Sequence, residues 1–147
     1  PPRSTVFPYT TLFRSLAGEH EREQAAPVLA AIPPARRLDL VGRTDLLTAA
    51  AALRRTELFI GNDTGLMHIA AAAGVPTVGL FGPSPAARFA PWGPRTAVAQ
   101  TALAPAELMS HVDFDHRTTD TLMDSLTVEM AEAAARGLWQ RLHGAAA

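Results

Sequence analysis

The sequence predicts an α/β protein with a parallel, doubly wound sheet and helices on both faces. From residue 16 onward, short apolar runs closed by glycine alternate with helix-like segments that follow a capping residue. Strands that alternate with helices in this way pair in parallel through right-handed crossovers. The stretch Glu57–Pro83 shows the pattern most clearly, so the other elements are assigned around it.

The composition excludes several classes of protein. The chain has 147 residues, enough for one domain with a sizeable core. The formal net charge is −1, so charge gives no reason to expect a nucleic-acid partner. The absence of cysteine excludes disulfides and thiolate metal sites and suits a cytoplasmic protein. No apolar run reaches the roughly 18–20 residues that a membrane helix needs.

The first fifteen residues differ from the rest of the chain. They mix proline, aromatic and hydroxyl side chains without helix or strand periodicity, and the string FPYTTLFRS is similar to translated sequencing-adapter read-through. We therefore expect residues 1–15 to be non-native or disordered and residues 16–147 to form one domain that is incomplete at its N-terminus. A native, flexible terminus is the alternative. Leu16–Gly18 could be the tail of a strand that begins earlier.

The next elements follow in order. Glu19–Ile32 predicts a helix, which Pro27 should kink or delay. Leu38–Val41 predicts a short strand. Thr44 is then expected to cap a helix that ends near Arg55 and carries one apolar face.

The central stretch predicts a strand, a loop, a helix and a second strand. Glu57–Gly61 is an apolar run of the kind that is buried on both faces of a sheet. Asn62–Gly65 has turn chemistry, and Leu66–Ala73 is a helix of small residues. Gly74 should end that helix, and Thr77–Phe81 is the second buried strand.

The last part of the chain contains fewer strong signals. Pro83–Pro94 is expected to be a loop, and Thr96–Gln100 a final strand. Pro105–Ser110 is a weak helical piece inside a long connection. Thr127 should cap the last helix, Val128–Leu142, whose apolar residues recur on one face.

Two loops hold the residues that could bind a ligand. Ligands of open parallel sheets bind beyond the carboxyl ends of the strands, where this sequence has Asn62–Gly65 and Gly82–Ser84. Unpaired N–H groups at a helix start suit phosphate, and Gly65 lets the backbone approach a ligand closely. Asp63 could accept hydrogen bonds from loop N–H groups or from a sugar hydroxyl. Alternatively, Asp63 and Thr64 only cap the helix.

Further candidates lie near these loops. His68, in the first helical turn, could reach a phosphate oxygen or simply pack under the loop. Glu21 could accept ribose hydroxyls or be a solvated acid at a helix start. No second His, Glu or Cys lies at metal-ligand spacing, so we expect no metal. A solvated turn is the interpretation for the cluster His111, Asp113, Asp115 and His116.

The run FIGNDTGLMHIAAAAGVPTVGLFGPSPAARFAPWG resembles the signature of glycosyltransferase family 9, the ADP-heptose:lipopolysaccharide heptosyltransferases. The family pattern is a strand, then D-[ST]-G-x-x-H-x-A-A, G-x-P-T, an apolar strand and F-G-P. The positions that match it are Asp63, Thr64, Gly65, His68, Ala70, Ala71, Gly74, Pro76, Thr77, Phe81, Gly82 and Pro83. The segments LAGEHERE, LVGRTDL and LMDSLTVE resemble the flanks, so the resemblance covers roughly residues 16–143.

This resemblance implies a GT-B glycosyltransferase with two Rossmann-like domains, of which residues 16–147 would be the C-terminal, nucleotide-sugar-binding one. Glu21 would hold the ribose, Thr44 would lie by the adenine, and His68 would support the loop or the phosphate. The last helix would pack back towards the N-terminal domain. The donor-binding set would be Asn62, Asp63, Thr64, Gly65, His68, Glu21, Thr44, Gly82 and Pro83.

The implied function is transfer of heptose from ADP-heptose to the lipopolysaccharide core, in the cytoplasm and optionally at the inner membrane surface. The acceptor domain, its catalytic Asp base and the first strand of the donor domain would lie outside this chain. We therefore expect no catalytic residue and no cofactor here, and no sugar transfer by this chain alone. The alternatives are a GT-B nucleotide-sugar 2-epimerase and a non-catalytic nucleotide-binding module. His68 argues against the epimerase, which usually has Glu there.

Overall fold

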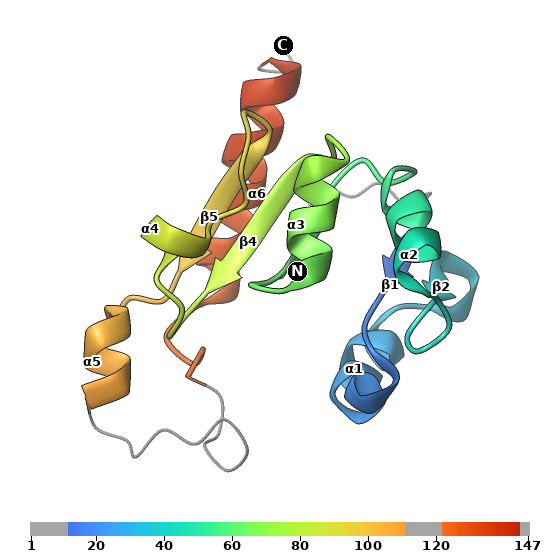
Figure 1. The fold of residues 1–147 in the computed structure, drawn as a ribbon, viewed down its shortest axis with the longest axis horizontal. Helices are drawn as coiled ribbons and strands as arrows, with labels where there is room; N and C mark the ends of the chain where they lie inside the picture. The colour runs from blue at the N-terminus through green and yellow to red at the C-terminus, as the bar shows by residue number, and fades with distance from the viewer. Residues whose placement is uncertain (1–11, 111–121, 145–147) are drawn as a thin grey trace. The chain divides into compact units, whose positions relative to one another are not determined.

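The structure is a computed structural model, which describes residues 12–110 and 122–144. The chain divides into two compact units, Pro1–Ala51 and Ala52–Ala147. Each unit contains its own parallel sheet, of two strands in the first and three in the second (Figure 1). Parallel strands that alternate with helices confirm the predicted α/β class.

The first unit is built on strands β1 (Phe13–Ser15) and β2 (Arg37–Asp39). Phe13 lies opposite Arg37 in the parallel register. Backbone pairing continues beyond both strands, because the N–H of Gly42 donates to the Ala17 carbonyl at 2.9 Å. The strand expected at residues 38–41 is therefore shifted towards the N-terminus, while its backbone stays paired beyond Asp39.

Strand β1 lies inside the segment 1–15, for which we expected neither helix nor strand. That expectation is wrong for Phe13–Ser15. The pairing is made by backbone groups and needs no apolar periodicity, and the three side chains are only partly buried. The guanidinium of Arg36 also lies 5.5 Å from the centre of the Phe13 ring. The origin of residues 1–15 stays a prediction.

The first predicted helix begins late. A single 3-10 turn, η1 (Glu19–Glu21), precedes α1 (Arg22–Ala31), which contains Pro27. After α1, a second 3-10 turn, η2 (Pro34–Arg36), leads into β2. The guanidinium of Arg37 donates to the carbonyls of Leu29 and Ile32, so it satisfies acceptors that the end of α1 leaves open.

Helix α2 (Leu46–Leu53) is capped by a different residue from the one expected. Asp45 Oδ1 accepts a hydrogen bond from the N–H of Thr48 at 2.7 Å, which is the capping interaction predicted for Thr44. Thr44 and Asp45 are both residue types that cap helices well. Because α2 begins at Leu46, the capping position falls on Asp45 and not on Thr44. The bond to Thr48 lowers the pKa of Asp45 below its ordinary value.

The second unit contains a parallel sheet in the order β3 (Phe59–Asn62), β4 (Thr77–Phe81) and β5 (Thr96–Gln100). Strands β4 and β5 match the predicted ranges, and β3 lies within one or two residues of its prediction. The loop predicted at 83–94 contains one short helix, α4 (Ala86–Phe89). The weak helical piece is helix α5 (Pro105–Ser110).

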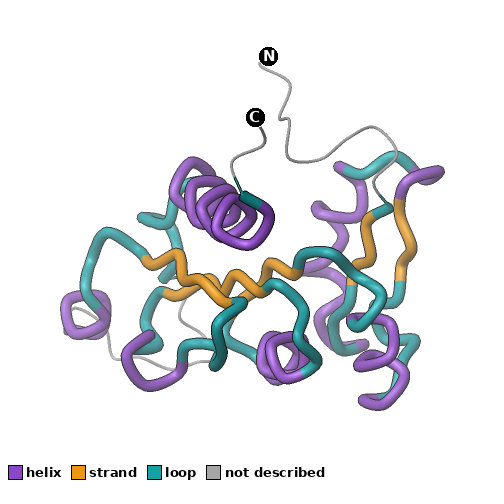
Figure 2. The backbone as a smooth tube through the Cα atoms, turned by 90° about the horizontal axis from the view of Figure 1, so that it is seen from above, coloured by secondary structure: helices purple, strands orange, loops and turns teal. Residues whose placement is uncertain are grey.

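Helices cover both faces of this sheet (Figure 2). Helix α3 (Gly65–Ala72) packs on β3 and β4, and α6 (Val128–His143) packs on β4 and β5. Val78 is buried with Ala135 and Leu138 of α6. An ideal Cβ on the next residue, Gly79, would lie 2.7 Å from Met67 Sδ of α3, so successive residues of β4 face opposite helices.

The last helix starts as predicted and packs against its own sheet. Thr127 Oγ1 accepts a hydrogen bond from the N–H of Met130 at 3.3 Å. Helix α6 covers β4 and β5. Its packing towards an N-terminal domain, which the resemblance implied, stays a prediction. In the described residues, no helix is long and apolar enough to cross a membrane.

Candidate functional site

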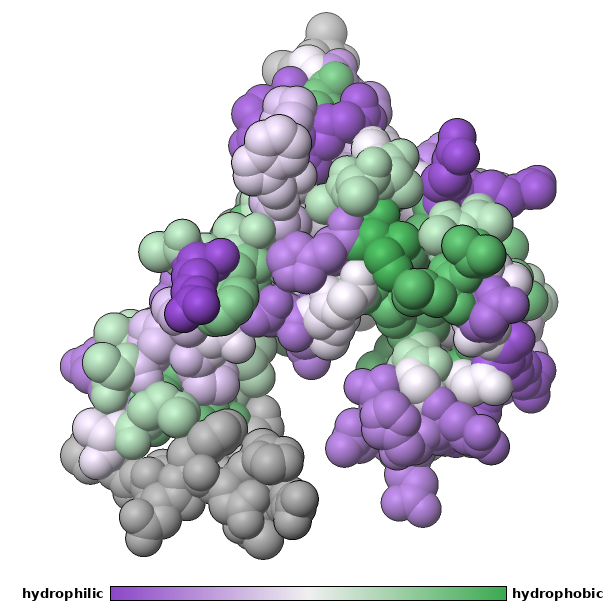
Figure 3. Space-filling model, viewed as in Figure 1, coloured by the Kyte–Doolittle hydropathy of each residue, from purple (hydrophilic) through white to green (hydrophobic). Residues whose placement is uncertain are grey.

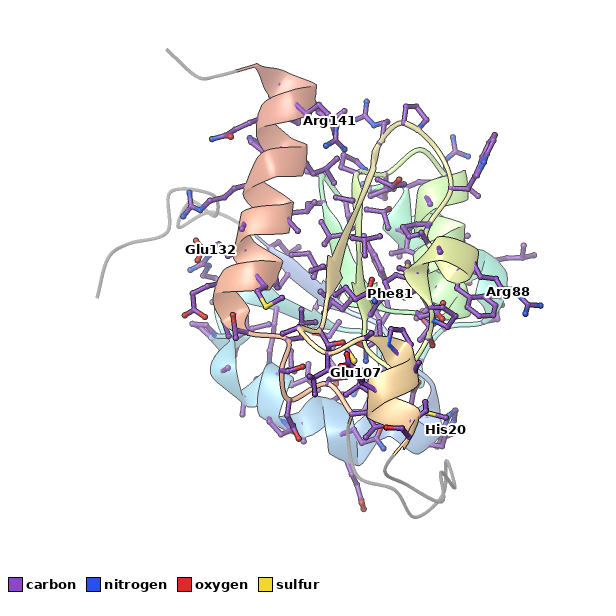
Figure 4. All side chains as sticks on the ribbon, turned by 90° about the vertical axis from the view of Figure 1, so that its left-hand side faces the viewer. His20, Phe81, Arg88, Glu107, Glu132 and Arg141 are labelled. Atoms are coloured by element: carbon purple, nitrogen blue, oxygen red, sulfur yellow. The ribbon has the colours of Figure 1, made fainter. Side chains whose placement is uncertain are left out.

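The two loops singled out from the sequence follow neighbouring strands. Strand β3 ends at Asn62 and β4 ends at Phe81, and Asn62 lies opposite Leu80 in the parallel register. Both loops therefore leave the sheet at its carboxyl edge, as predicted. Phe81, labelled in Figure 4, is 1% exposed and fixes the end of β4 in the core.

The start of α3 presents unsatisfied donors. Thr64 is the N-cap residue with extended backbone, but its side chain makes no capping hydrogen bond. The Thr64 carbonyl accepts from the N–H groups of Met67 at 3.1 Å and His68 at 3.4 Å. Among the described residues, the N–H groups of Gly65 and Leu66 have no acceptor. The loop thus offers two peptide N–H groups and the Thr64 hydroxyl to a ligand.

The position of Gly65 is open. An ideal Cβ there would meet no atom within 4 Å, and Gly65 is not one of the glycines with positive φ. Neither packing nor backbone conformation therefore requires glycine at this position. Space next to the peptide N–H groups is what an approaching ligand needs.

Asp63 and His68 face each other beside this opening. His68 Nε2 lies 3.7 Å from Asp63 Oδ1, and their side chains are 48% and 21% exposed. The distance is too long for a hydrogen bond but attractive when the imidazole is protonated. His68 is therefore half-exposed at the loop rather than packed beneath it. No loop N–H donates to Asp63 within the described chain, so its carboxylate can still accept from a hydroxyl group.

Gly82 is glycine for a different reason. Its ideal Cβ would lie 2.4 Å from Met123 Sδ and 3.1 Å from the Leu122 carbonyl oxygen. The segment before α6 therefore covers the end of β4 and leaves no room for a side chain. Pro83 and Ser84 follow, and both are partly buried. Sequence reasoning did not find this contact, because it joins residues 41 positions apart.

Glu21 and Thr44 belong to the first unit, whereas the loop residues belong to the second. Glu21 Oε2 accepts a hydrogen bond from the N–H of Gly18 at 2.6 Å, so one carboxylate oxygen closes the start of η1. Thr44 is partly buried and precedes the capping Asp45. The roles of Glu21 and Thr44 at the donor stay predictions.

A charged network at the end of β2 was not predicted from the sequence. Asp39 lies 3.1 Å from Arg22 Nη1 and 3.7 Å from Arg43 Nη2, and it accepts from the N–H of Val41 at 3.0 Å. The hydrogen bond from Arg22, followed by the one from Val41, lowers the pKa of Asp39 below its ordinary value. The sequence carries no clear sign of this network, because the i, i+4 spacing of Asp39 and Arg43 predicts an ion pair only within a helix, and Asp39 ends a strand.

The cluster His111, Asp113, Asp115 and His116 lies outside the described residues, and it contains an Asp-x-Asp pair at Asp113 and Asp115. Within residues 12–110 and 122–144, no three His, Asp or Glu side chains converge on a metal position. The expectation that this chain needs no metal therefore stays a prediction.

Comparison with known proteins decides the family. The sequence profile described as Glycosyltransferase family 9 (heptosyltransferase) matches residues 9–113. The chain belongs to glycosyltransferase family 9. The match begins inside the segment 1–15 and takes in both candidate loops. Among curated proteins, none matches this family 9 chain significantly.

Two solved structures share the fold of this family 9 chain. The glycosyl transferase family 9 from Veillonella parvula DSM 2008 has a TM-score of 0.71 and 24% identity, over 88% of this chain and 37% of its own. The E. coli ADP-heptose lps heptosyltransferase II has a TM-score of 0.65 and 23% identity, over 89% of this chain and 37% of its own. The chain thus has a Rossmann-like α/β fold of GT-B type and spans little more than a third of these proteins.

Proposed function

We propose that this chain is the donor-binding part of a glycosyltransferase that moves heptose from ADP-heptose to the lipopolysaccharide core. Its membership of family 9 supports a glycosyltransferase. The observation that carries the proposal is the open space over Gly65, next to the unsatisfied N–H groups at the start of α3. A diphosphate needs both features, because it must approach the backbone closely and accept several hydrogen bonds.

Each residue of the loop has a distinct task in this proposal. The N–H groups of Gly65 and Leu66, with the Thr64 hydroxyl, donate to the diphosphate. These donors stabilise the charge that develops on the departing diphosphate, which accelerates direct displacement at the sugar. Asp63 accepts from a sugar hydroxyl, and His68, whose Nε2 lies 3.7 Å from Asp63 Oδ1, supports the loop or contacts the phosphate.

Asn62, Gly82 and Pro83 lie at the same sheet edge as Asp63 and supply further donor contacts in the second unit. For the first unit, the resemblance to family 9 assigns the ribose to Glu21 and the adenine to Thr44. Glu21 keeps one carboxylate oxygen for the ribose, because only Oε2 accepts from Gly18. In this proposal the acceptor-binding residues and the general base lie outside this chain, so the chain binds donor without transferring the sugar. The enzyme works in the cytoplasm or at the inner membrane surface, where donor and acceptor meet.

Substitution in the full-length enzyme tests this proposal. Asp63→Ala should lower sugar transfer by at least tenfold, about 1.4 kcal/mol, because a charge-assisted hydrogen bond to the donor is lost. The matched control is Asp124→Ala, which removes an exposed carboxylate of the same unit. Equal activity of the two variants would remove Asp63 from the site. Epimerisation of a nucleotide sugar, or nucleotide binding without any turnover, would instead support one of the two alternative functions.

A further inference from the structure

A hollow lies at the end of the three-stranded sheet opposite to the candidate site. Its volume is about 410 Å³, within the range of small-molecule sites. It is lined by residues that precede β3, β4 and β5 and by the last turns of α6, and every one of these residues belongs to the second unit. The strands of Figure 1 begin at this end, where α6 finishes.

Two arginines line this hollow without any described partner. Arg54 follows α2 and Arg95 precedes β5, and neither makes an ion pair or side-chain hydrogen bond within the described residues. Arg141, labelled in Figure 4, behaves differently because its Nη2 donates to the Thr96 carbonyl at 2.7 Å. Arg141 therefore serves the fold, whereas the guanidinium groups of Arg54 and Arg95 remain available to a ligand.

The other wall of the hollow is aromatic. The rings of Trp139 and His143 stack with centroids 4.0 Å apart, and both residues line the hollow. Glu57 is the only acidic residue in the lining, so two guanidinium groups face one carboxylate and the lining favours an anion. Guanidinium groups bind phosphate through paired N–H donors, and an indole offers an apolar surface to the group that carries the phosphate.

We propose that this hollow binds a phosphate ester, with Arg54 and Arg95 holding the phosphate and Trp139 contacting its organic group. The phosphate belongs to a soluble phosphorylated compound or to a lipid headgroup, which have the same chemistry at this site. Helix α3 ends at this hollow, and cations are favoured near helix C-termini. The two arginines could therefore stabilise the end of α3 instead of binding a ligand, and the experiment must distinguish these two roles.

Tryptophan fluorescence gives a direct test, because the chain has only two tryptophans. Trp92 is 89% exposed and does not line the hollow, so Trp92→Phe leaves Trp139 as the sole reporter. Titration of this protein with phenyl phosphate, or with phosphatidylglycerol vesicles, should give a saturable change in Trp139 emission. Arg54→Ala and Arg95→Ala should each weaken binding by about tenfold, the worth of a hydrogen bond to a charged group.

Matched variants separate the hollow from other sites. Arg88→Ala removes an exposed arginine outside the hollow and should leave the titration unchanged. Asp63→Ala should also leave it unchanged, which distinguishes this site from the proposed donor site. Glu57→Gln should tighten binding because it removes the only repelling carboxylate, and Arg54→Lys should restore part of the lost affinity.

Vesicles identify the source of the phosphate. A response to phosphatidylglycerol vesicles, but not to phosphatidylcholine vesicles or phenyl phosphate, supports a lipid headgroup; a response to phenyl phosphate supports a soluble ester. The proposal is overturned if neither probe changes Trp139 emission, or if the change persists in the Arg54→Ala/Arg95→Ala variant. Loss of thermal stability in that variant, with no phosphate-dependent signal in the parent, would assign the arginines to the fold.

Discussion

Gly65, which ends the first loop of the candidate site, and Gly82, which follows strand β4, are glycine for opposite physical reasons. Gly65 faces open space, whereas the Cβ position of Gly82 is occupied by Met123. We expect Gly65→Ala to leave the free energy of unfolding unchanged, or to raise it by up to about 1 kcal/mol, while nucleotide binding weakens at least tenfold. Gly82→Ala should cost about 1–3 kcal/mol through overpacking. Denaturant unfolding and calorimetric titration of both variants measure the two effects separately.

The same measurements can contradict the assignment of Gly65. If Gly65→Ala unfolds at lower denaturant concentration and binds nucleotide normally, the glycine serves the fold and the ligand does not approach it. Met123→Ala combined with Gly82→Ala is the control for the second glycine. This pair should recover part of the stability lost in Gly82→Ala, since the two changes concern one contact.

Asp39 gives the first unit a pH dependence whose sign follows from its pKa. The carboxyl is paired with Arg22, so its pKa in the folded chain lies below the unfolded value of 3.8. The stabilisation is complete above pH 3.8 and is lost as the pH falls through the folded pKa. Asp39→Asn should therefore lower stability at pH 7, and this loss should be smaller at pH 2.

Thermal unfolding of the first unit followed by NMR at these two pH values checks this prediction. Glu23→Gln, at an exposed position of α1, is the control and should have no effect at either pH. A stability difference for Asp39→Asn that is the same at pH 2 and pH 7 would show that the carboxylate charge is not the cause.

Helix α6 supplies buried side chains to the core of the three-stranded sheet. Leu138 is fully buried and packs with Val78 and Ala135. We expect Leu138→Ala to lower the free energy of unfolding of the second unit by about 2–5 kcal/mol, because it removes buried methyl groups and leaves a cavity. Gln140→Ala, on the exposed face of α6, should stay within about 0.5 kcal/mol. Denaturant unfolding of both variants measures this difference, and equal stabilities would mean that α6 does not pack on the sheet.

The elements also show what a sequence can and cannot predict. Strand β4 is an apolar run bounded by Pro76 and Gly82, and these local signals were sufficient to predict its ends. Strand β1 has no such pattern, because its three residues pair only through the backbone. The choice of Asp45 over Thr44 as cap depends on which of two adjacent residues starts the helix. The loop at Asn62–Gly65 could be predicted because capping residues and glycines mark a turn within a few residues of sequence. The contact between Met123 and Gly82 could not be predicted, because these residues are far apart in the sequence.

Exposed apolar side chains on α2 favour association with other surfaces. Leu46 and Leu47 of α2 are 65% and 82% exposed, and Figure 3 shows apolar residues gathered over this helix. Exposed apolar patches mark surfaces that another element or protein covers. We expect the isolated chain to self-associate, and Leu46→Glu/Leu47→Glu to reduce this association. Light scattering across a concentration series measures it, with Thr48→Glu as the control; identical scattering of parent and double variant would contradict the prediction.

Calorimetric titration of this chain with ADP-heptose tests most directly whether the loop between β3 and α3 holds the donor. The proposed donor site predicts one binding site per chain, weaker than in the full-length enzyme, with no requirement for a divalent cation. Asp63→Ala should weaken binding at least tenfold, while Arg54→Ala, at the opposite end of the sheet, should leave it unchanged. Tight binding that depends on a metal ion, or binding unaffected by Asp63→Ala, would contradict the claim that the loop between β3 and α3 holds the donor.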